Sequence, residues 1–280
     1  MARRLFCEIS PATYAVSKWK EQWKRRLKQF FSRKRFAAHF SQEPLPVLLY
    51  AHKSLIRRKL GDVDMRLQEN KAVNLSLAAP RLSGIIIAPG ETFSLWRLVG
   101  KPSAKRGFLK GLAIANSHTT ADVGGGMCQL SNLLHWMVLH SPLQVTEYHH
   151  HNDFDLFPDF GRTVPFGTGT SILYNYLDYQ ARNSLAFPVQ LLVWTTDTHL
   201  CGELRAARDI GFTYHIAETE SYFTRENNEV FRNNTVVRNT VDKRTGDIVA
   251  AEIVCVSHAK VMYDKSYINP ELIRSLTPTS

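Results

Sequence analysis

Hydrophobic positions recur along this chain with a helical period in its first half and a strand-like period in its second. The clearest helix is predicted over residues 127–140, where Leu130, Leu133, Leu134, Met137 and Val138 form one apolar face before Ser141-Pro142 ends it. The same period predicts helices over 13–38, over 47–60 with Gly61 at its end, and briefly over 74–79 before Pro80.

Strand signals prevail after residue 142. Alternating or continuous apolar runs predict strands over 144–148, 171–176, 189–194, 212–216, 235–241 and 248–256, with a hairpin turn at Thr245-Gly246-Asp247. One earlier run, Gly84–Gly90, has the glycine-bounded form of a buried strand and ends in a Pro-Gly turn. Helices followed by a mostly antiparallel sheet predict an α+β fold.

Three regions follow from this order of elements: a helical region over 1–60, a core domain over 61–206 and a β-rich extension over 207–280. The chain has 280 residues, 44% of them hydrophobic, which is enough to bury a core.

The net charge of the chain, +10, lies at one end, because residues 1–60 hold fifteen Lys/Arg and three Glu. A basic end suits nucleic acid, anionic lipid or an acidic ligand.

The segment 13–38 combines that charge with aromatic residues. Trp19, Trp23 and Leu27 recur at helical spacing, and lysines and arginines occupy much of the remainder. Such a helix can lie on an anionic membrane surface with its tryptophans at headgroup depth. It can equally pack its apolar stripe on its own domain.

Four widely spaced cysteines, with no Cys-x-x-Cys pair, predict reduced thiols rather than a disulfide framework. The N-terminus has no apolar stretch of signal-peptide length, and no segment has the length of a membrane span. We therefore expect a cytoplasmic protein, peripheral at the inner face of the membrane if the basic helix binds there.

Cys128 is the candidate nucleophile. It follows three glycines and Met127 at the first turn of the best predicted helix, where the positive helix end stabilises a thiolate and lowers the thiol pKa. The alternative is a small buried cysteine that only packs. A phosphate loop lacks support, because no Gly-Lys-Ser/Thr follows the glycines.

A thiolate needs a base, and the stretch Glu147-Tyr148-His149-His150-His151 supplies candidates about twenty residues downstream. In an extended segment His149 and His151 face one side, so one of these two is the predicted partner. The same residue types suit zinc, although no His-x-x-x-His or Cys-x-x-Cys frame accompanies them. They can also form an ordinary polar loop.

Substrate contacts are expected around the same turn. Gly125 and Gly126 allow close backbone approach, and Gln129 lies one residue after the cysteine. Arg162 can clamp a carboxylate with its fork of donors, or it can merely neutralise Asp155 or Asp159.

Several motifs in fixed order resemble the VanW family, whose founding member is encoded with some glycopeptide-resistance clusters. The similarity starts near Arg66 and includes Pro89-Gly90-Glu91-Thr92-Phe93-Ser94, Gly124-Gly125-Gly126-Met127-Cys128-Gln129-Leu130-Ser131 and Asp178-Tyr179-Gln180-Ala181-Arg182-Asn183. The resemblance implies a bacterial protein tied to the cell wall or to glycopeptide resistance.

For other VanW-domain proteins an L,D-transpeptidase-like activity on peptidoglycan stem peptides has been proposed. Carried over, it makes Cys128 the nucleophile, and the family's Glu-x-His-x-His stretch corresponds to Glu147, His149 and His151. Two departures bear on this transfer. Gly167-Thr168-Gly169-Thr170 replaces a Gly-x-Asp-Ala element, and the absence of an export signal points to lipid-linked or nucleotide-linked precursors.

The leading hypothesis is therefore a cell-wall-directed cysteine acyltransferase acting on a peptidoglycan precursor or stem peptide. It needs no cofactor and no metal, and we expect no nucleic-acid partner. The alternatives are a non-catalytic module that binds the precursor or a partner enzyme, and a zinc-dependent hydrolase.

Overall fold

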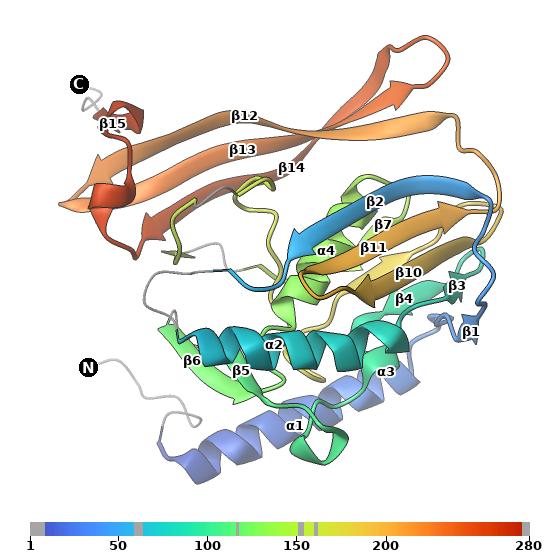
Figure 1. The fold of residues 1–280 in the computed structure, drawn as a ribbon, viewed down its shortest axis with the longest axis horizontal. Helices are drawn as coiled ribbons and strands as arrows, with labels where there is room; N and C mark the ends of the chain where they lie inside the picture. Colours follow the sequence, from blue (N-terminus) through green and yellow to red (C-terminus); the bar gives the residue numbers. More distant parts are fainter. Residues whose placement is uncertain (1–8, 59–63, 116–117, 151–153, 160–161, 276–280) are drawn as a thin grey trace.

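The computed structural model describes residues 9–58, 64–115, 118–150, 154–159 and 162–275. Helices and three sheets form a core, and a fourth sheet of long strands arches over one side of it, opposite the N-terminal helix (Figure 1). The predicted α+β fold is confirmed.

The described residues form four α-helices: α1 (Pro11–Phe30), α2 (Met65–Ala78), α3 (Leu95–Val99) and α4 (Cys128–Leu139). The predicted helix over 127–140 is confirmed, and its five apolar residues are all buried. The short helix predicted over 74–79 is the end of the longer α2, which Asp64 caps by accepting a hydrogen bond from the Arg66 N–H. The helix predicted over 13–38 ends earlier, at Phe30.

The central sheet has the strand order β1-β3-β10-β11-β2. Its strands are β1 (His39–Phe40), β2 (Val47–Leu55), β3 (Ile85–Ile87), β10 (Val189–Thr195) and β11 (His199–Ala206). The helix predicted over 47–60 is wrong, because Val47–Leu55 pairs with β11 as an edge strand. The buried strand predicted within 84–90 and the strand over 189–194 are confirmed as β3 and β10.

Two smaller sheets complete the core. One has the order β4-β9-β7, from β4 (Thr92–Ser94), β9 (Gln180–Arg182) and β7 (Gln144–Glu147), and the other pairs β5 (Lys110–Ala115) with β6 (His118–Val123). The strand predicted over 171–176 is wrong. That segment turns at Asn175, which has a φ of 52°, and makes only an isolated bridge between Leu173 and Leu177.

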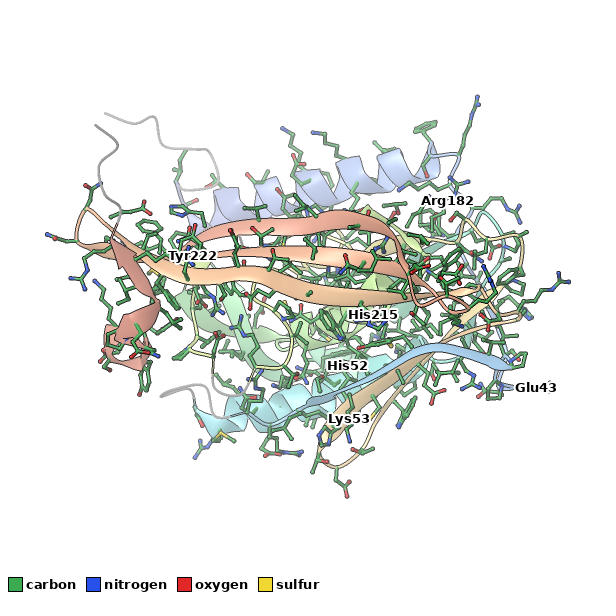
Figure 2. The ribbon with its side chains drawn as sticks, turned by 90° about the horizontal axis from the view of Figure 1, so that it is seen from above. Glu43, His52, Lys53, Arg182, His215 and Tyr222 are labelled. Carbon is green, nitrogen blue, oxygen red and sulfur yellow. The ribbon has the colours of Figure 1, made fainter. Side chains whose placement is uncertain are left out.

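The last sheet has the order β15-β12-β13-β14-β8. Its strands are β12 (Phe212–Glu226), β13 (Glu229–Asp242), β14 (Ile248–Val261), β15 (Ile273–Ser275) and β8 (Phe154–Asp155). The three long strands contain the three predicted C-terminal strands and extend them. Seen from above, they lie across the core, with His215 and Tyr222 on β12 (Figure 2).

The main hydrophobic core lies between α2, α4 and the central sheet, where Leu75, Leu130, Met137, Val189 and Leu204 are nearly inaccessible to solvent. A second, smaller cluster around Phe223, Val230, Val261 and Ile268 belongs to the last sheet. Two separate apolar clusters mean that the long strands do not merely extend the core. They carry their own packing and cover one side of α4 and β7.

Candidate functional site

Cys128 is the first residue of α4, as the sequence predicts. The residue is partly exposed, but its thiol points inward and is hydrogen-bonded to the backbone of Ile172. Burial raises the pKa of the thiol and outweighs this hydrogen bond, which lowers it. The direction is opposite to the one that the helix-end argument predicts, so the resting thiol is protonated near neutral pH.

The glycines before Cys128 pack closely against neighbouring chain. A Cβ at Gly125 would overlap the carbonyl group of Gly111 in β5, and one at Gly126 would overlap the side chain of Lys71 in α2. Gly126 also has a φ of 89°, which disfavours other residues. The Asn74 amide donates to the Gly125 carbonyl at 2.9 Å. These two glycines therefore fix the turn that opens α4, whatever else they contact.

The segment that precedes Ile172 is tied to the first turns of α4. The Asn132 amide oxygen accepts hydrogen bonds from the Thr170 N–H at 2.7 Å and from the Thr170 hydroxyl at 2.8 Å. Ser131 and Thr170 also share a short hydrogen bond between their hydroxyl groups. Sequence reasoning quoted Ser131 and Thr170 within longer motifs but did not single out Asn132, although it lies one helical turn after Cys128.

His149 lies on the other side of the same segment. Its carbonyl accepts a hydrogen bond from the Ser171 N–H at 2.7 Å, and its Nε2 is 3.1 Å from Glu147 Oε1. Among the described residues, no hydrogen bond joins His149 directly to Cys128. The two predicted partners therefore flank residues 170–172, and His151 lies outside the described residues.

Glu147 connects His149 to the N-terminal helix. Its Oε2 is 2.7 Å from the Arg25 guanidinium, and its Oε1 accepts from the Asp178 N–H at 2.9 Å. Burial acts to raise the pKa of Glu147, but the hydrogen bonds from Arg25 and Asp178 outweigh it and lower the pKa. Glu147 is therefore an ionised carboxylate that orients the His149 ring.

A buried aromatic group lies two helical turns below Cys128. The His135 ring stacks on Tyr148 with centroids 4.5 Å apart, and its Nδ1 is 3.3 Å from the Tyr179 hydroxyl. Burial, together with nearby His150, lowers the pKa of His135 to about 3, so the ring is neutral at pH 7. The sequence analysis did not single out His135, although its spacing of seven residues places it on the face of α4 that carries Cys128.

A cleft of about 430 Å³ opens beside this group, between α4, β7 and the long strands. His135 and Tyr148 line it from the core, and Tyr214, Arg238 and Ile253 line it from the last sheet. Arg238 pairs with Glu252 and lies 5.1 Å from the centroid of the Tyr214 ring. The cleft therefore joins an apolar wall to one guanidinium group.

Two predicted substrate contacts have partners within the fold. The Gln129 amide donates to the Ser54 hydroxyl at 2.9 Å and to the Leu55 carbonyl at 3.0 Å, so it holds the end of β2. The Arg162 guanidinium lies 3.1 Å from the Asp159 carboxylate. For Arg162 this is the neutralising role that the sequence left open beside the carboxylate clamp.

In the part of the chain that the structure describes, no three His, Cys, Asp or Glu side chains are arranged to hold a metal ion. The three described cysteines, Cys128, Cys201 and Cys255, are free thiols. No helix in the described ranges is both long and apolar enough to cross a bilayer.

Comparison with known proteins identifies the family. The family model described as VanW like protein matches residues 70–205. The chain is 33% identical over 228 residues to the vancomycin B-type resistance protein VanW of Enterococcus faecalis (strain ATCC 700802 / V583), covering 81% of this chain and 82% of that protein. The chain belongs to the VanW family. The match to the family model runs from α2 to β11 and contains the glycine turn, α4 and β7, whereas α1 and the long strands lie outside that match.

A second relative is the uncharacterized protein YoaR of Bacillus subtilis (strain 168), 26% identical over 124 residues that cover 43% of this chain and 38% of that protein. No solved structure matches. Glu147 is the carboxylate that contacts His149 within the described residues, with its Oε1 3.1 Å from His149 Nε2.

Proposed function

We propose that this member of the VanW family is a cysteine acyltransferase that acts on the stem peptide of a peptidoglycan precursor. One observation carries the proposal: a cysteine at the start of α4 and a histidine held by a carboxylate flank the same three residues, Thr170–Ile172. This combination of nucleophile, base and orienting group is the arrangement that covalent acyl transfer requires.

The reaction has two steps. The Cys128 sulfur attacks a peptide carbonyl while its proton passes to His149, and the C–N bond then breaks as the leaving amine takes that proton. An acceptor amine next attacks the thioester and displaces the Cys128 sulfur, which recovers a proton. Backbone N–H groups at the start of α4 are the candidate donors to the oxyanion of both tetrahedral intermediates.

The raised thiol pKa sets a condition on this mechanism. Because the resting thiol is protonated and bonded to the Ile172 backbone, the substrate must displace that bond and bring the His149 ring to the sulfur. Residues 170–172 are the segment that has to move, since they contact both groups. Catalysis then depends on substrate binding rather than on a preformed ion pair.

The cleft below His135 has the chemistry to bind such a substrate. Its guanidinium, Arg238, would bind a carboxylate of the peptide by exchanging its present partner Glu252, and its apolar wall suits the side chains or the lipid carrier. The proposed substrates are lipid-linked and nucleotide-linked precursors, which both carry the stem peptide.

Intact-mass spectrometry of the full chain, incubated with a nucleotide-linked pentapeptide precursor, tests the proposal. We expect a thioester adduct whose mass equals that of the whole precursor minus its leaving amine, lost in Cys128→Ala and kept in Cys201→Ser. The rate should rise with pH and fall in His149→Ala. Saturable binding of the precursor with no adduct and no turnover at any pH would overturn the proposal.

That last outcome describes the second candidate, a module that binds the precursor without chemistry. The observation that favours it is the Cys128 thiol itself, which burial keeps protonated and which already has a backbone partner. In that case Cys128→Ser should bind the precursor as tightly as the unaltered chain.

A further inference from the structure

Helix α1 exposes its apolar residues. Val16, Trp19, Trp23, Leu27 and Phe31 follow one another at helical spacing from α1 into the residue after it, and each is between 45% and 76% exposed. Trp19 and Trp23 meet edge to face, with ring centroids 6.0 Å apart. The stripe extends over about 22 Å, since fifteen residues rise 1.5 Å each.

The contacts that the described residues of α1 make with the core are polar. Arg25 donates to the Tyr176 carbonyl at 2.6 Å and pairs with Glu147, and the Gln22 carbonyl accepts from the Asn175 amide at 3.0 Å. Arg25 lies about 180° around the helix from Val16, given 100° per residue. The helix is therefore inverted relative to an ordinary surface helix, whose apolar side faces the core.

Charge surrounds the stripe. Residues 11–35 contain nine lysines and arginines and a single acidic residue, Glu21. Lys20, Lys24, Arg33 and Arg35 are exposed beside the apolar side chains. Such a surface repels a second copy of itself, which disfavours a dimer through α1.

We propose that α1 is a docking helix for an anionic lipid bilayer. Its tryptophans and aliphatic side chains enter the headgroup region, and its lysines and arginines contact the anionic headgroups. Val16 and Leu27 favour this partner over nucleic acid, which offers phosphate and base stacking but no acyl chains for aliphatic side chains. Figure 2 shows α1 at one margin of the molecule, with side chains that point away from the long strands.

Docking stands independently of acyl transfer, but it fixes an orientation. Arg25 lies on the helix face opposite the bilayer and pairs with Glu147. Glu147 in turn contacts His149, the residue that we propose as base. If the proposed function holds, a precursor on a lipid carrier meets the site from the same surface that holds the protein.

Co-sedimentation of the full chain with vesicles tests the docking. We expect binding to vesicles of phosphatidylglycerol and phosphatidylcholine, weak binding to phosphatidylcholine alone, and a loss with added salt. The double variant Trp19→Ala/Trp23→Ala should lose at least tenfold in partition coefficient. The matched control is Trp194→Ala, which removes another exposed tryptophan on β10 and should leave the partition unchanged.

The charge variant Lys20→Glu/Lys24→Glu should also bind at least tenfold less tightly to anionic vesicles. Circular dichroism and thermal unfolding should match the unaltered chain for all variants, since the changed side chains are exposed. Equal partition of the tryptophan variant would overturn the proposal. So would competition by duplex RNA that depends on the lysines but not on the tryptophans, which would identify a nucleic-acid face.

Discussion

Close contacts between backbone atoms determine the structural role of the triple glycine. Gly125 lies against Gly111 so closely that neither residue has room for a side chain, and Asn74 closes the contact by bonding both the Gly125 and the Leu109 carbonyl groups. The turn therefore joins α2, β5 and the start of α4 at one point. Cys128 takes its position from that junction.

Gly125→Ala should destabilise the protein by about 2 to 4 kcal/mol, because the added methyl overlaps a backbone carbonyl that cannot move aside. The free energy of unfolding in urea measures the effect. Gly169→Ala is the control, since a Cβ there meets no atom within 4 Å. Equal unfolding midpoints for the two variants would show that the junction is not rigid.

At the residue scale the sequence predicted part of the candidate site. Cys128 and His149 lie beside one segment of the chain. The sequence could place each of them because a helix start and a strand end both leave readable signals. Arg25 left no such signal, since it meets its partners only through the tertiary fold, and Asp178 and Thr170 were noted only through the family motifs. Glu147 was part of the histidine stretch chosen from the residues alone, and the family motif includes it as well.

At the scale of helices and strands, the contact between α1 and β7 lies next to the candidate site. Glu147, at the end of β7, accepts from Arg25 of α1 and from the Asp178 N–H before β9. One carboxylate thus holds a helix, a loop and a histidine ring. Its charge state decides how strongly they are held.

Glu147→Gln should cost about 1 to 3 kcal/mol of unfolding free energy at pH 7, where the carboxylate is ionised. The folded-state pKa of Glu147 lies below its ordinary value of 4.5, so the stability it contributes is present above that value and is lost as the pH falls through the folded pKa. Urea unfolding at pH 7 and near pH 3.5 should therefore show a smaller difference at the lower pH.

Glu43→Gln is the matched control, because Glu43 is exposed and its carboxylate makes no ion pair within the described part of the chain. It should not differ from the unaltered protein at either pH. A penalty for Glu147→Gln that stays constant down to pH 3.5 would contradict the assignment of an ionised Glu147.

The sequence predicted elements well where apolar periodicity was long. It failed over Val47–Leu55. The apolar residues Leu48, Leu49 and Tyr50 were assigned to a helix, but the segment is a strand that pairs with β11 at a sheet edge. It missed β11, whose inward positions include Gly202 and Ala206; Gly202 is small because Met137 of α4 packs there. Small inward residues hide the alternation that reveals a strand.

Across the whole molecule, a buried arginine joins the long strands to the core. Arg232 of β13 lies 2.6 Å from the Asp159 carboxylate and 3.5 Å from Asp155, with the rings of Phe166 and Phe223 within 6 Å. Asp155 is itself part of β8, which pairs with β14. The last sheet is therefore bonded to the segment that follows the histidines.

Arg232→Met should destabilise the protein by about 3 to 5 kcal/mol, because it leaves the Asp155 carboxylate buried without its cation. Limited proteolysis should then release the long strands as a separate fragment. Arg208→Ala, at an exposed position before β12, should change stability by less than about 0.5 kcal/mol. Unchanged stability of Arg232→Met would mean that the sheet is held by its apolar cluster alone.

The polar attachment of α1 also has a calorimetric consequence. Heat capacity and denaturant sensitivity both scale with the apolar area that a transition exposes. The described contacts between α1 and the core are hydrogen bonds and ion pairs, and its apolar side is already in solvent. Breaking these described contacts would therefore leave almost no trace in a melting curve, while amide hydrogen exchange would register it as a low-energy opening that salt promotes.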